Sequence, residues 1–291
     1  MITGLVLLAV AQASVATDLW RVAQGTLVRP AALGEAGSAT FWTPAIRLDS
    51  AVKVRVGIDA VHAPSETGVE GGVVSVSFRT GRFAIMTIGY GRMGIADVAY
   101  TETSPEAIGS SIPIWSQSAA IGVSLDPGRS LTAGASLRFV EGRLGPSRRT
   151  QAGIDLGLRY RPSPRLELGA ATLFFDPTFG SGARGTVYSL GGTLAGPALS
   201  VWGAEGVLSV RYGSQLQQGE SAQQLLLAAL GLGRTEIVWG AGYESAYGES
   251  TWRSRFGVAL GAGSYRVEIG RDGGANGFGA TWRFGLMGEF R

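Results

Sequence analysis

Cysteine is absent from the 291-residue sequence, and histidine occurs only once, at position 62. Without cysteine the chain has no disulfide framework, no thiolate nucleophile and no cysteine-ligated metal. A single histidine provides no multi-histidine ligand set and leaves the activation of any nucleophile to one residue. We therefore expect neither a cofactor nor an enzyme.

Charged residues are also scarce, at 16% of the sequence against roughly a quarter in ordinary soluble domains. The net charge is +3 and the arginines are scattered one or two at a time, so no nucleic-acid partner is expected. Long apolar runs are missing as well. After the N-terminus the longest run covers residues 225–232, far short of the ~20 residues that a transmembrane helix needs.

Glycine is abundant instead, with 46 residues, about twice its usual ~7% share. The 45% hydrophobic content and a positive mean hydropathy argue against disorder. Much of the chain consists of segments in which apolar side chains alternate with polar or small ones. In AVKVRVGIDAV, residues 51–61, valine and isoleucine alternate with lysine, arginine, glycine and aspartate. A period of two predicts strands with two unlike faces.

The first residues, MITGLVLLAVAQASVATDLW, combine a short apolar run with small-x-small sites at 11–13 and 14–16. This pattern is typical of a secretory signal peptide, although no lysine or arginine precedes the run. A short N-terminal anchor is the alternative, but the run is too short to span a bilayer. We interpret residues 1–16 as a signal peptide.

The alternating segments predict about fourteen strands, most of them near the ~9–11 residues that a tilted membrane strand needs. Their expected positions are 52–61, 72–80, 83–94, 116–126, 130–142, 150–161, 165–175, 186–195, 198–212, 221–232, 234–245, 251–262, 264–271 and 277–290. The connections alternate between longer and shorter, as in outer-membrane barrels with long outer loops and tight periplasmic turns. We expect an all-β fold, an antiparallel up-and-down transmembrane β-barrel over residues 51–291. Its place would be the bacterial outer membrane, among outer-membrane lipid and lipopolysaccharide.

Aromatic residues give an independent check on this arrangement. If strand directions follow the loop pattern, two sets of rings lie at the two rims, as anchoring at the membrane interfaces requires. The expected outer set is Tyr90, Phe139, Phe174, Tyr212, Tyr243 and Trp252, and the inner set is Phe78, Phe83, Tyr160, Tyr265 and Phe290. A soluble β-sandwich or propeller would also alternate, but it explains neither the scarce charge nor the two rims.

The last predicted strand, in GFGATWRFGLMGEFR, has the same two faces. We expect it to close the barrel against residues 51–61, with Arg283 and Glu289 facing the lumen. The side chains expected to face lipid are Trp282, Phe284, Leu286 and Phe290.

The same parity places further charges on the wall of the lumen. The expected lumen-facing charges include Arg55, Asp59, Asp155, Arg159, Arg211, Glu236, Arg253, Arg255 and Arg283. Opposite charges in such numbers could line a selective water-filled pore, or they could form paired ladders that brace a narrow barrel. We favour the ladders because both signs are interspersed and no constriction of a single sign is visible.

Residues 17–50 do not follow the strand rhythm. Small and apolar residues recur there at a helix-like spacing, with one proline before them and one after. The pattern predicts a short helical segment that folds inward as a hatch or plug. Its expected residues are Pro30, Leu33, Gly34, Gly37, Phe41, Trp42 and Pro44.

Within this segment RPAALGEAGSA (29–39), followed by FWTPA (41–45), resembles the Ala/Gly-rich hatch and Asn-Pro-Ala element of PorV/PorQ-like proteins. Those proteins belong with the FadL-type fourteen-stranded barrels of bacterial outer membranes. The match covers about thirty residues, with Thr43 in place of the usual asparagine and residues 38–40 in place of the usual acidic pair. The resemblance implies a hatch inside the barrel. It also implies service to a secretion machine, with protein cargo or secretion-system components as partners, or else uptake of hydrophobic compounds.

An enzymatic interpretation has little support. Residues 89–94, GYGRMG, match the dinucleotide fingerprint, but no helical period follows them, and the motif is informative only between a strand and a helix. His62 could be a base, a metal ligand or a pH-sensitive residue, and an ordinary exposed loop residue is the simplest interpretation. We favour a secretion or scaffold barrel, keep a FadL-like channel for hydrophobic or small solutes as the alternative, and rank an outer-membrane enzyme last.

Overall fold

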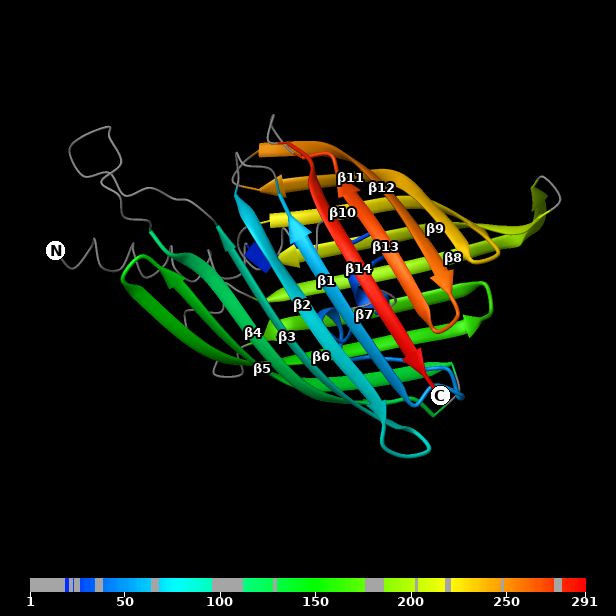
Figure 1. Ribbon diagram of the computed structural model, residues 1–291, viewed down its shortest axis with the longest axis horizontal. Helices are drawn as coiled ribbons and strands as arrows, with labels where there is room; N and C mark the ends of the chain where they lie inside the picture. Colours follow the sequence, from blue (N-terminus) through cyan, green and yellow to red (C-terminus); the bar gives the residue numbers. More distant parts are fainter. Residues whose placement is uncertain are drawn as a thin grey trace.

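The computed structural model describes residues 19–20, 23, 27–34, 39–63, 68–95, 112–127, 130–175, 186–201, 204–217, 221–246, 249–274 and 279–291. Within these ranges the chain forms a closed barrel of fourteen antiparallel strands, each paired with its sequence neighbours, and β1 closes on β14 (Figure 1). The predicted barrel is therefore confirmed. In this part of the chain no helix has the length and apolar character to cross a membrane.

The strands follow one another around the barrel. Their bounds are β1 Val54–His62, β2 Val69–Arg79, β3 Ala84–Ile95, β4 Ile114–Leu125, β5 Leu131–Leu144, β6 Ser147–Ser163, β7 Leu166–Phe175, β8 Val187–Val201, β9 Ala204–Gln217, β10 Ser221–Leu232, β11 Thr235–Ala246, β12 Glu249–Ala262, β13 Tyr265–Asp272 and β14 Thr281–Phe290. Outer-membrane barrels keep their short turns on the periplasmic side. The short-turn end, where β1 begins and β14 ends, is therefore the periplasmic end.

The seam between the first and last strands shows the two faces of the wall. Antiparallel pairing runs from Val54, opposite Phe290, to His62, opposite Trp282. On β14 the four predicted lipid-facing side chains are exposed on the outer surface, whereas Arg283 is 1% exposed in the lumen. Apolar side chains thus cover the outside, where lipid replaces water, and polar groups turn inward.

The connection between β5 and β6 is shorter than the alternation predicts. The expected strands end at 142 and resume at 150, but the observed ladder continues until Leu144 lies opposite Ser147. Only residues 145 and 146 remain in the turn, and Gly145 has a φ of 58°. Two-residue hairpins need positive φ at the first central position, and glycine reaches it without strain. The polar residues expected in a loop therefore belong to long strands.

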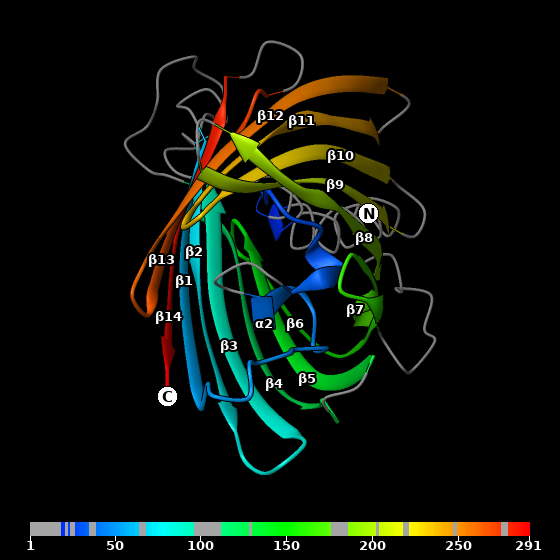
Figure 2. The same ribbon diagram turned by 90° about the vertical axis from the view of Figure 1, so that its right-hand side faces the viewer.

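The described residues ahead of β1 lie inside the ring of strands, where α2 contacts β2 and β3 and the 3-10 turn η1 contacts β6, β7 and β8 (Figure 2). Helix in these residues is limited to positions 19–20 and 23, the 3-10 turn η1 (Ala31–Leu33) and the four-residue α2 (Ala39–Trp42). The helical form expected for the hatch is therefore not confirmed. Gly34, at a φ of 60°, ends η1, and helices this short depend on tertiary contacts rather than on helical propensity.

Candidate functional site

The described residues 19–20, 23, 27–34 and 39–52 precede β1, pack against the inner wall of the barrel and are here called the plug. Its large side chains are withdrawn from solvent, and Trp20, Leu33 and Phe41 are each at most 1% exposed. The predicted hatch residue Gly37 lies outside the described residues. The structure buries the other predicted hatch residues, which are Pro30, Leu33, Gly34, Phe41, Trp42 and Pro44.

Glycines on the lumen wall allow the plug backbone to lie directly against the strands. A Cβ atom added to Gly134 of β5 would lie 2.0 Å from the carbonyl oxygen of Pro44. One added to Gly169 of β7 would lie 2.5 Å from that of Ala32. Close approaches to the plug also occur at Gly157, Gly191 and Gly257. Part of the high glycine content therefore serves contact with the plug, because any side chain at these positions would displace it.

Apolar contacts join the plug to the outer ends of β1, β2, β3, β7 and β8. This apolar cluster consists of Leu19, Trp20, Ala23, Leu27, Ala31, Phe41, Trp42, Val61, Ala63, Val69, Val73, Met93, Leu173, Phe174 and Val187. The ring centroids of Trp20 and Phe41 are 4.9 Å apart, and those of Phe41 and Trp42 are 5.0 Å apart. Trp20 Nε1 donates a 2.9 Å hydrogen bond to Ser116 Oγ, which satisfies the one polar atom of the indole.

A buried arginine holds one edge of the apolar cluster. The guanidinium of Arg138 lies 4.5 Å from the ring centroid of Phe41 and 4.9 Å from that of Phe174. Its Nε donates to Asp155 Oδ2 at 2.7 Å, and its Nη2 donates to the carbonyl oxygen of Phe41 at 2.6 Å. Arg138 therefore connects the wall to the plug through a charge pair, a backbone contact and two cation–π contacts.

Phe174 lies in the lumen and not in the outer aromatic rim, so that part of the rim prediction is wrong. The β6–β7 ladder gains one residue on β7 between Thr172 and Phe175. Phe174 takes a φ of 58°, and its N–H donates to Asp155 Oδ1 at 2.9 Å. A bulge of one residue reverses the inward and outward parity of a strand. Simple alternation therefore fails here.

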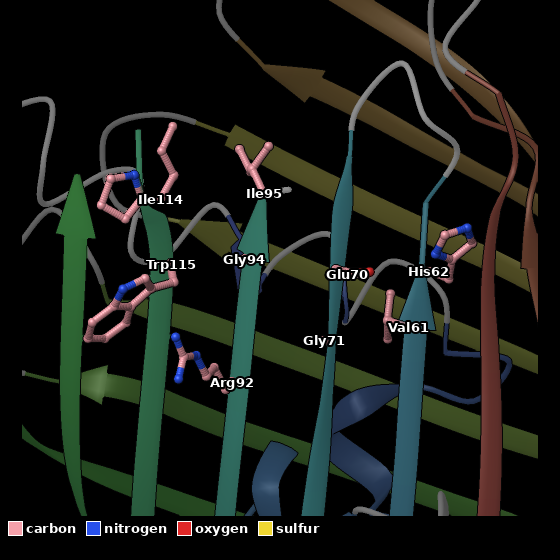
Figure 3. A pocket seen from close by; sticks show the side chains of 10 residues that line it. Val61, His62, Glu70, Gly71, Arg92, Gly94, Ile95, Ile114 and Trp115 are labelled. Carbon is pink, nitrogen blue, oxygen red and sulfur yellow. The ribbon is translucent and has the colours of Figure 1, made fainter. Parts of the chain in front are cut away.

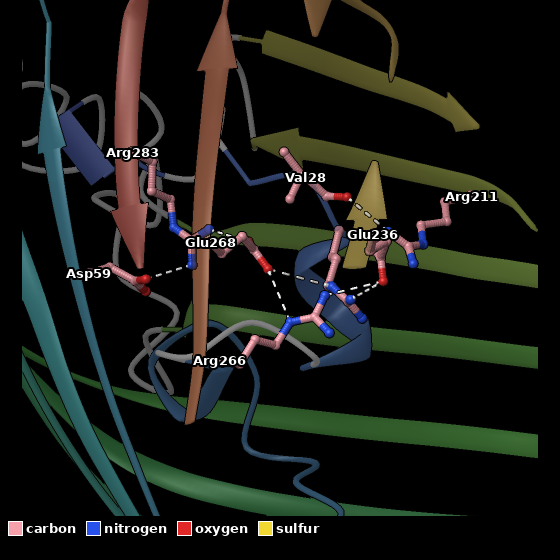
Figure 4. A network of polar contacts seen from close by, with 8 residues as sticks. Val28, Asp59, Arg211, Glu236, Arg266, Glu268 and Arg283 are labelled. Carbon is pink, nitrogen blue, oxygen red and sulfur yellow. Dashed lines mark hydrogen bonds and ion pairs between the residues drawn. The ribbon is translucent and has the colours of Figure 1, made fainter. Parts of the chain in front are cut away.

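A second set of contacts is ionic and surrounds Arg29, the only charged residue in 27–34. Figure 4 shows the two carboxylates of this set, Glu236 and Glu268, beside the plug residue Val28. Arg29 Nη2 lies 2.6 Å from Glu236 Oε2, and its Nε lies 3.7 Å from Glu268 Oε2. Glu236 also accepts hydrogen bonds from Arg211 at 2.7 Å and from Arg266 at 3.1 Å. The plug is thus fixed by charge to β11 and β13.

The ionic contacts continue to the barrel seam. Arg283 Nη1 donates to Glu268 Oε1 at 2.5 Å, and its Nη2 donates to Asp59 Oδ1 at 2.6 Å. Charge on the plug is therefore connected through β13 and β14 to β1. The ionic cluster, as we use the term, comprises Arg29, Asp59, Arg211, Glu236, Arg266, Glu268 and Arg283.

Each of the nine predicted lumen charges has a partner of opposite sign. Asp59, Arg211, Glu236 and Arg283 belong to the ionic cluster, and Asp155 pairs with Arg138. The remaining pairs are Arg55–Glu289, Arg159–Glu167, Arg253–Glu244, Arg253–Asp272 and Arg255–Asp272. The described charges are interleaved in sign, and they brace the wall and hold the plug.

Sequence analysis did not identify Arg29 and Arg138 as anchors of the plug. Arg29 carries a signal in retrospect, because it is an isolated charge in the otherwise apolar stretch LVRPAALG. A charge in such a stretch needs a partner when it is buried. Arg138 carries no comparable signal, since it is one of many arginines at alternating strand positions.

A hollow of about 660 Å³ lies at the outer ends of β1–β4 (Figure 3). The side chains of Arg92 and Trp115 lie next to each other there, with the guanidinium 4.9 Å from the ring centroid. His62 borders the same hollow from the last position of β1, a strand end rather than the expected loop. Residues 89–94, which match the dinucleotide fingerprint, all lie within β3.

Comparison with known proteins supports the fold. No family model matches the sequence, and no curated protein matches it. Two solved toluene transporters are similar in structure. TbuX of Ralstonia pickettii matches with a TM-score of 0.59 and 13% identity, over 90% of this chain and 98% of that one. TodX of Pseudomonas putida matches with a TM-score of 0.56 and 12% identity, over 90% of this chain and 97% of that one. The outer membrane protein Omp33 of Acinetobacter baumannii matches with a TM-score of 0.50 and 9% identity, over 82% of this chain and 98% of that one. The chain spans 61% of the length of CdiB from Acinetobacter baumannii, at a TM-score of 0.46. The chain therefore has the fold of an outer-membrane β-barrel.

Proposed function

We propose that this protein is a plugged transport barrel through which small apolar solutes cross the outer membrane along the apolar side of the plug. The observation that carries the proposal is the division of plug contacts into an apolar cluster and an ionic cluster. The apolar cluster includes Val61, Val69 and Met93 at the outer ends of β1–β3. These side chains are buried under the plug, so an apolar solute would contact groups of its own polarity as the plug moves away from them.

The two clusters differ in the free energy needed to separate the plug from the wall. Apolar contacts are not directional, so an apolar solute can replace plug side chains such as Phe41 without leaving polar groups unpaired. Separating a buried ion pair by removing one partner costs about 3–5 kcal/mol. The path we propose therefore opens between the plug and β1–β3, β7 and β8. The contacts of Arg29 would keep the plug attached to β11 and β13.

The printed names of TbuX and TodX support the same class of solute, since both are toluene transporters. At 13% and 12% identity the likeness shows the fold alone. The chemistry comes from the residues of this chain, whose plug packs Trp20, Phe41 and Trp42 into the apolar cluster at the outer ends of the strands. We assign no catalytic step to any of these residues.

Flux through reconstituted protein tests the proposal. Purified protein in liposomes should pass small aromatic hydrocarbons and remain closed to inorganic ions. Phe41→Ala should increase hydrocarbon flux while leaving ion conductance low, because the contacts of Arg29 stay intact. Deletion of residues 17–50 should open the barrel to both. If neither the intact nor the deleted form passes hydrocarbons or ions, the channel function is wrong.

A second candidate is a secretion or scaffold barrel of PorV/PorQ type, which was our first expectation from the sequence. The close approach of plug backbone to Gly134 and Gly169 favours it, because a plug seated on the wall suits a barrel that stays closed. This function would give no solute flux with the intact plug. It would give specific copurification of a periplasmic or secreted protein that is lost in a variant with altered outer loops.

A further inference from the structure

Basic side chains gather on the outward face of the barrel at the outer ends of β3, β5 and β6, and a single further one, Arg271, lies beside Trp282 at the outer end of β13. Arg92, Arg143 and Arg148 occupy exposed positions near the outer ends of β3, β5 and β6. Arg92 alternates with the buried neighbours 91 and 93, which shows that it points out of the barrel. We call these three residues the basic arc. A charge on this face lies against the membrane and not in the lumen.

The strand register arranges the side chains near the basic arc in rows that run around the barrel. The lowest row is apolar, with Ile88, Ile121 and Leu137 opposite one another across β3–β5. The next row towards the outside contains Tyr90 and Phe139. Aromatic rings of this kind occupy the headgroup level of a membrane. Along β3 and along β5, the aromatic ring therefore marks the point on that strand where the acyl chains of the outer leaflet end and its headgroups begin.

Charged residues form the two rows beyond the aromatic one. Arg92 lies opposite Gln117, and Gln117 lies opposite Glu141. In the last row Trp115 lies opposite Arg143, which in turn lies opposite Arg148. The basic arc therefore stands directly outside the aromatic level, where the outer leaflet carries its phosphate groups.

The pairing of Arg143 with Arg148 points to an anionic ligand. Like charges directly opposite each other on neighbouring strands are destabilising. Glu141 forms an ion pair with Arg148 and accepts a 2.7 Å hydrogen bond from Gln117 Nε2, so its carboxylate is shared. Arg143 donates to the carbonyl oxygen of Gly145 at 3.0 Å, and this contact supplies no negative charge. The arc retains positive charge that an anion would neutralise.

The other side of the barrel provides a contrast at the same level. Outward positions in the outer parts of β8, β9, β11 and β12 carry Tyr188, Tyr212, Tyr243 and Trp252. The described outward residues there are uncharged. Aromatic anchoring alone is therefore sufficient on β8, β9, β11 and β12, and Arg271 of β13 stands singly beside Trp282, so the grouping of three arginines in the basic arc needs a separate explanation.

We propose that the basic arc binds the phosphate groups of lipid A, the membrane anchor of lipopolysaccharide. Arginine suits this ligand because its planar fork of N–H donors matches phosphate oxygens. The hollow of about 660 Å³ lined by His62, Glu70, Arg92 and Trp115 gives space beside the arc for the headgroup, with its phosphate on the Arg92 side, away from the Glu70 carboxylate (Figure 3). The apolar row below the arc contacts the acyl chains. The site depends on the location in the outer membrane and not on the proposed transport.

The matched control for the basic arc is Arg82, at the periplasmic end of the barrel. Its guanidinium lies 5.0 Å from the ring centroid of Phe83, which reproduces the contact of Arg92 with Trp115 at 4.9 Å. Arg82 is also exposed. At that end it faces the phospholipid leaflet, so its removal leaves the lipid A site intact while removing one arginine of the same kind.

The test measures binding of diphosphoryl lipid A to folded, detergent-solubilised protein by native mass spectrometry. Substituting all three arc residues, Arg92→Ala, Arg143→Ala and Arg148→Ala, should weaken binding by about tenfold or more, given the strength of hydrogen bonds to charged groups. Arg82→Ala should bind as tightly as wild type. Glu141→Gln should bind more tightly, because Arg148 loses its competing carboxylate. Misfolding would weaken lipid A binding, so tighter binding by Glu141→Gln cannot come from misfolding.

Two further ligands identify the source of the phosphate. Dephosphorylated lipid A should bind wild type as weakly as lipid A binds the triple variant, and inorganic phosphate at equal concentration should not displace lipid A. The proposal is overturned if the triple variant binds lipid A like the Arg82→Ala control, or if the dephosphorylated form binds as well as the phosphorylated one. Displacement by inorganic phosphate at equal concentration would assign the site to a free anion and also overturn it.

Discussion

Two kinds of contact hold the plug in the barrel, one apolar and one ionic. On the side of β1–β3, β7 and β8, rings such as Trp20 and Phe41 pack against aliphatic side chains. On the side of β11–β14, Arg29 reaches Glu236 and Glu268 through charge. Apolar packing is not directional, so an apolar ligand can replace an apolar side chain. A buried ion pair needs its own partner, and breaking it is strongly destabilising. The apolar side is suited to opening, and the ionic side to staying attached.

Arg138 belongs to both kinds of contact, so changing it should have the largest effect. Arg138→Met leaves Asp155 buried without its counter-charge and should lower the free energy of unfolding by about 3–5 kcal/mol. Urea titration of folded protein, followed by loss of the heat-modifiable band, measures the change. Adding Asp155→Asn removes the orphaned charge and keeps an acceptor for the Phe174 N–H, so the double variant should regain much of the loss. A single variant as stable as wild type would contradict the assignment.

Arg29→Met releases the ionic side of the plug and should have the next largest effect. Glu236 keeps Arg211 and Arg266, so no carboxylate there loses all of its partners, and the expected loss is about 1.5–3 kcal/mol. Ion conductance in planar bilayers should rise, in contrast to Phe41→Ala, which opens only the apolar side. Equal conductance from the two variants would remove the distinction between the sides.

Gly134→Ala tests the seating of the plug on the wall. The new Cβ would lie 2.0 Å from the carbonyl oxygen of Pro44, so the plug must shift, at a cost of about 1–3 kcal/mol. Thermal unfolding on unboiled gels measures the loss. Gly81→Ala is the control, because a Cβ there meets no atom within 4 Å. If both variants melt alike, direct contact with the plug is not the reason for glycine at position 134.

Trp20→Phe should give the smallest change. It removes the hydrogen bond to Ser116 but keeps an aromatic ring next to Phe41, so we expect a loss of about 1 kcal/mol. Hydrocarbon flux should stay within twofold of wild type, since apolar packing tolerates exchange of similar groups. A loss as large as that of Arg138→Met would show that the apolar side is as specific as the ionic one.

Strands that alternate regularly could be predicted from the sequence. In β14 the parity of Trp282 and Arg283 correctly separated lipid from lumen, because one face of the strand is buried and the other is not. Alternation predicts the wrong face or the wrong strand end where the backbone departs from a period of two. Phe174 turns inward through a bulge, and Gly145 turns the chain in two residues where a loop was expected.

Partners across the lumen could not be predicted, because they depend on where the plug comes to rest. Arg29 and Glu236 are 207 positions apart, and no local period connects them. The wall glycines have the same limitation. Gly134 and Gly169 resemble any other strand glycine until the plug backbone is placed against them. Sequence alternation defines the wall of the barrel, and tertiary contact alone defines what the wall holds.

The seam between β1 and β14 has a consequence for assembly. Arg55 and Glu289 are 234 positions apart, and Asp59 and Arg283 are 224 apart, yet both pairs form across this one junction. Contacts between such distant positions require the largest loss of loop entropy and form slowly. Closing the cylinder is therefore the step that brings the seam charges together. Because Arg283 also contacts Glu268, a partner of Arg29, the same step completes the binding site for the plug, and cylinder closure and plug docking become one folding event.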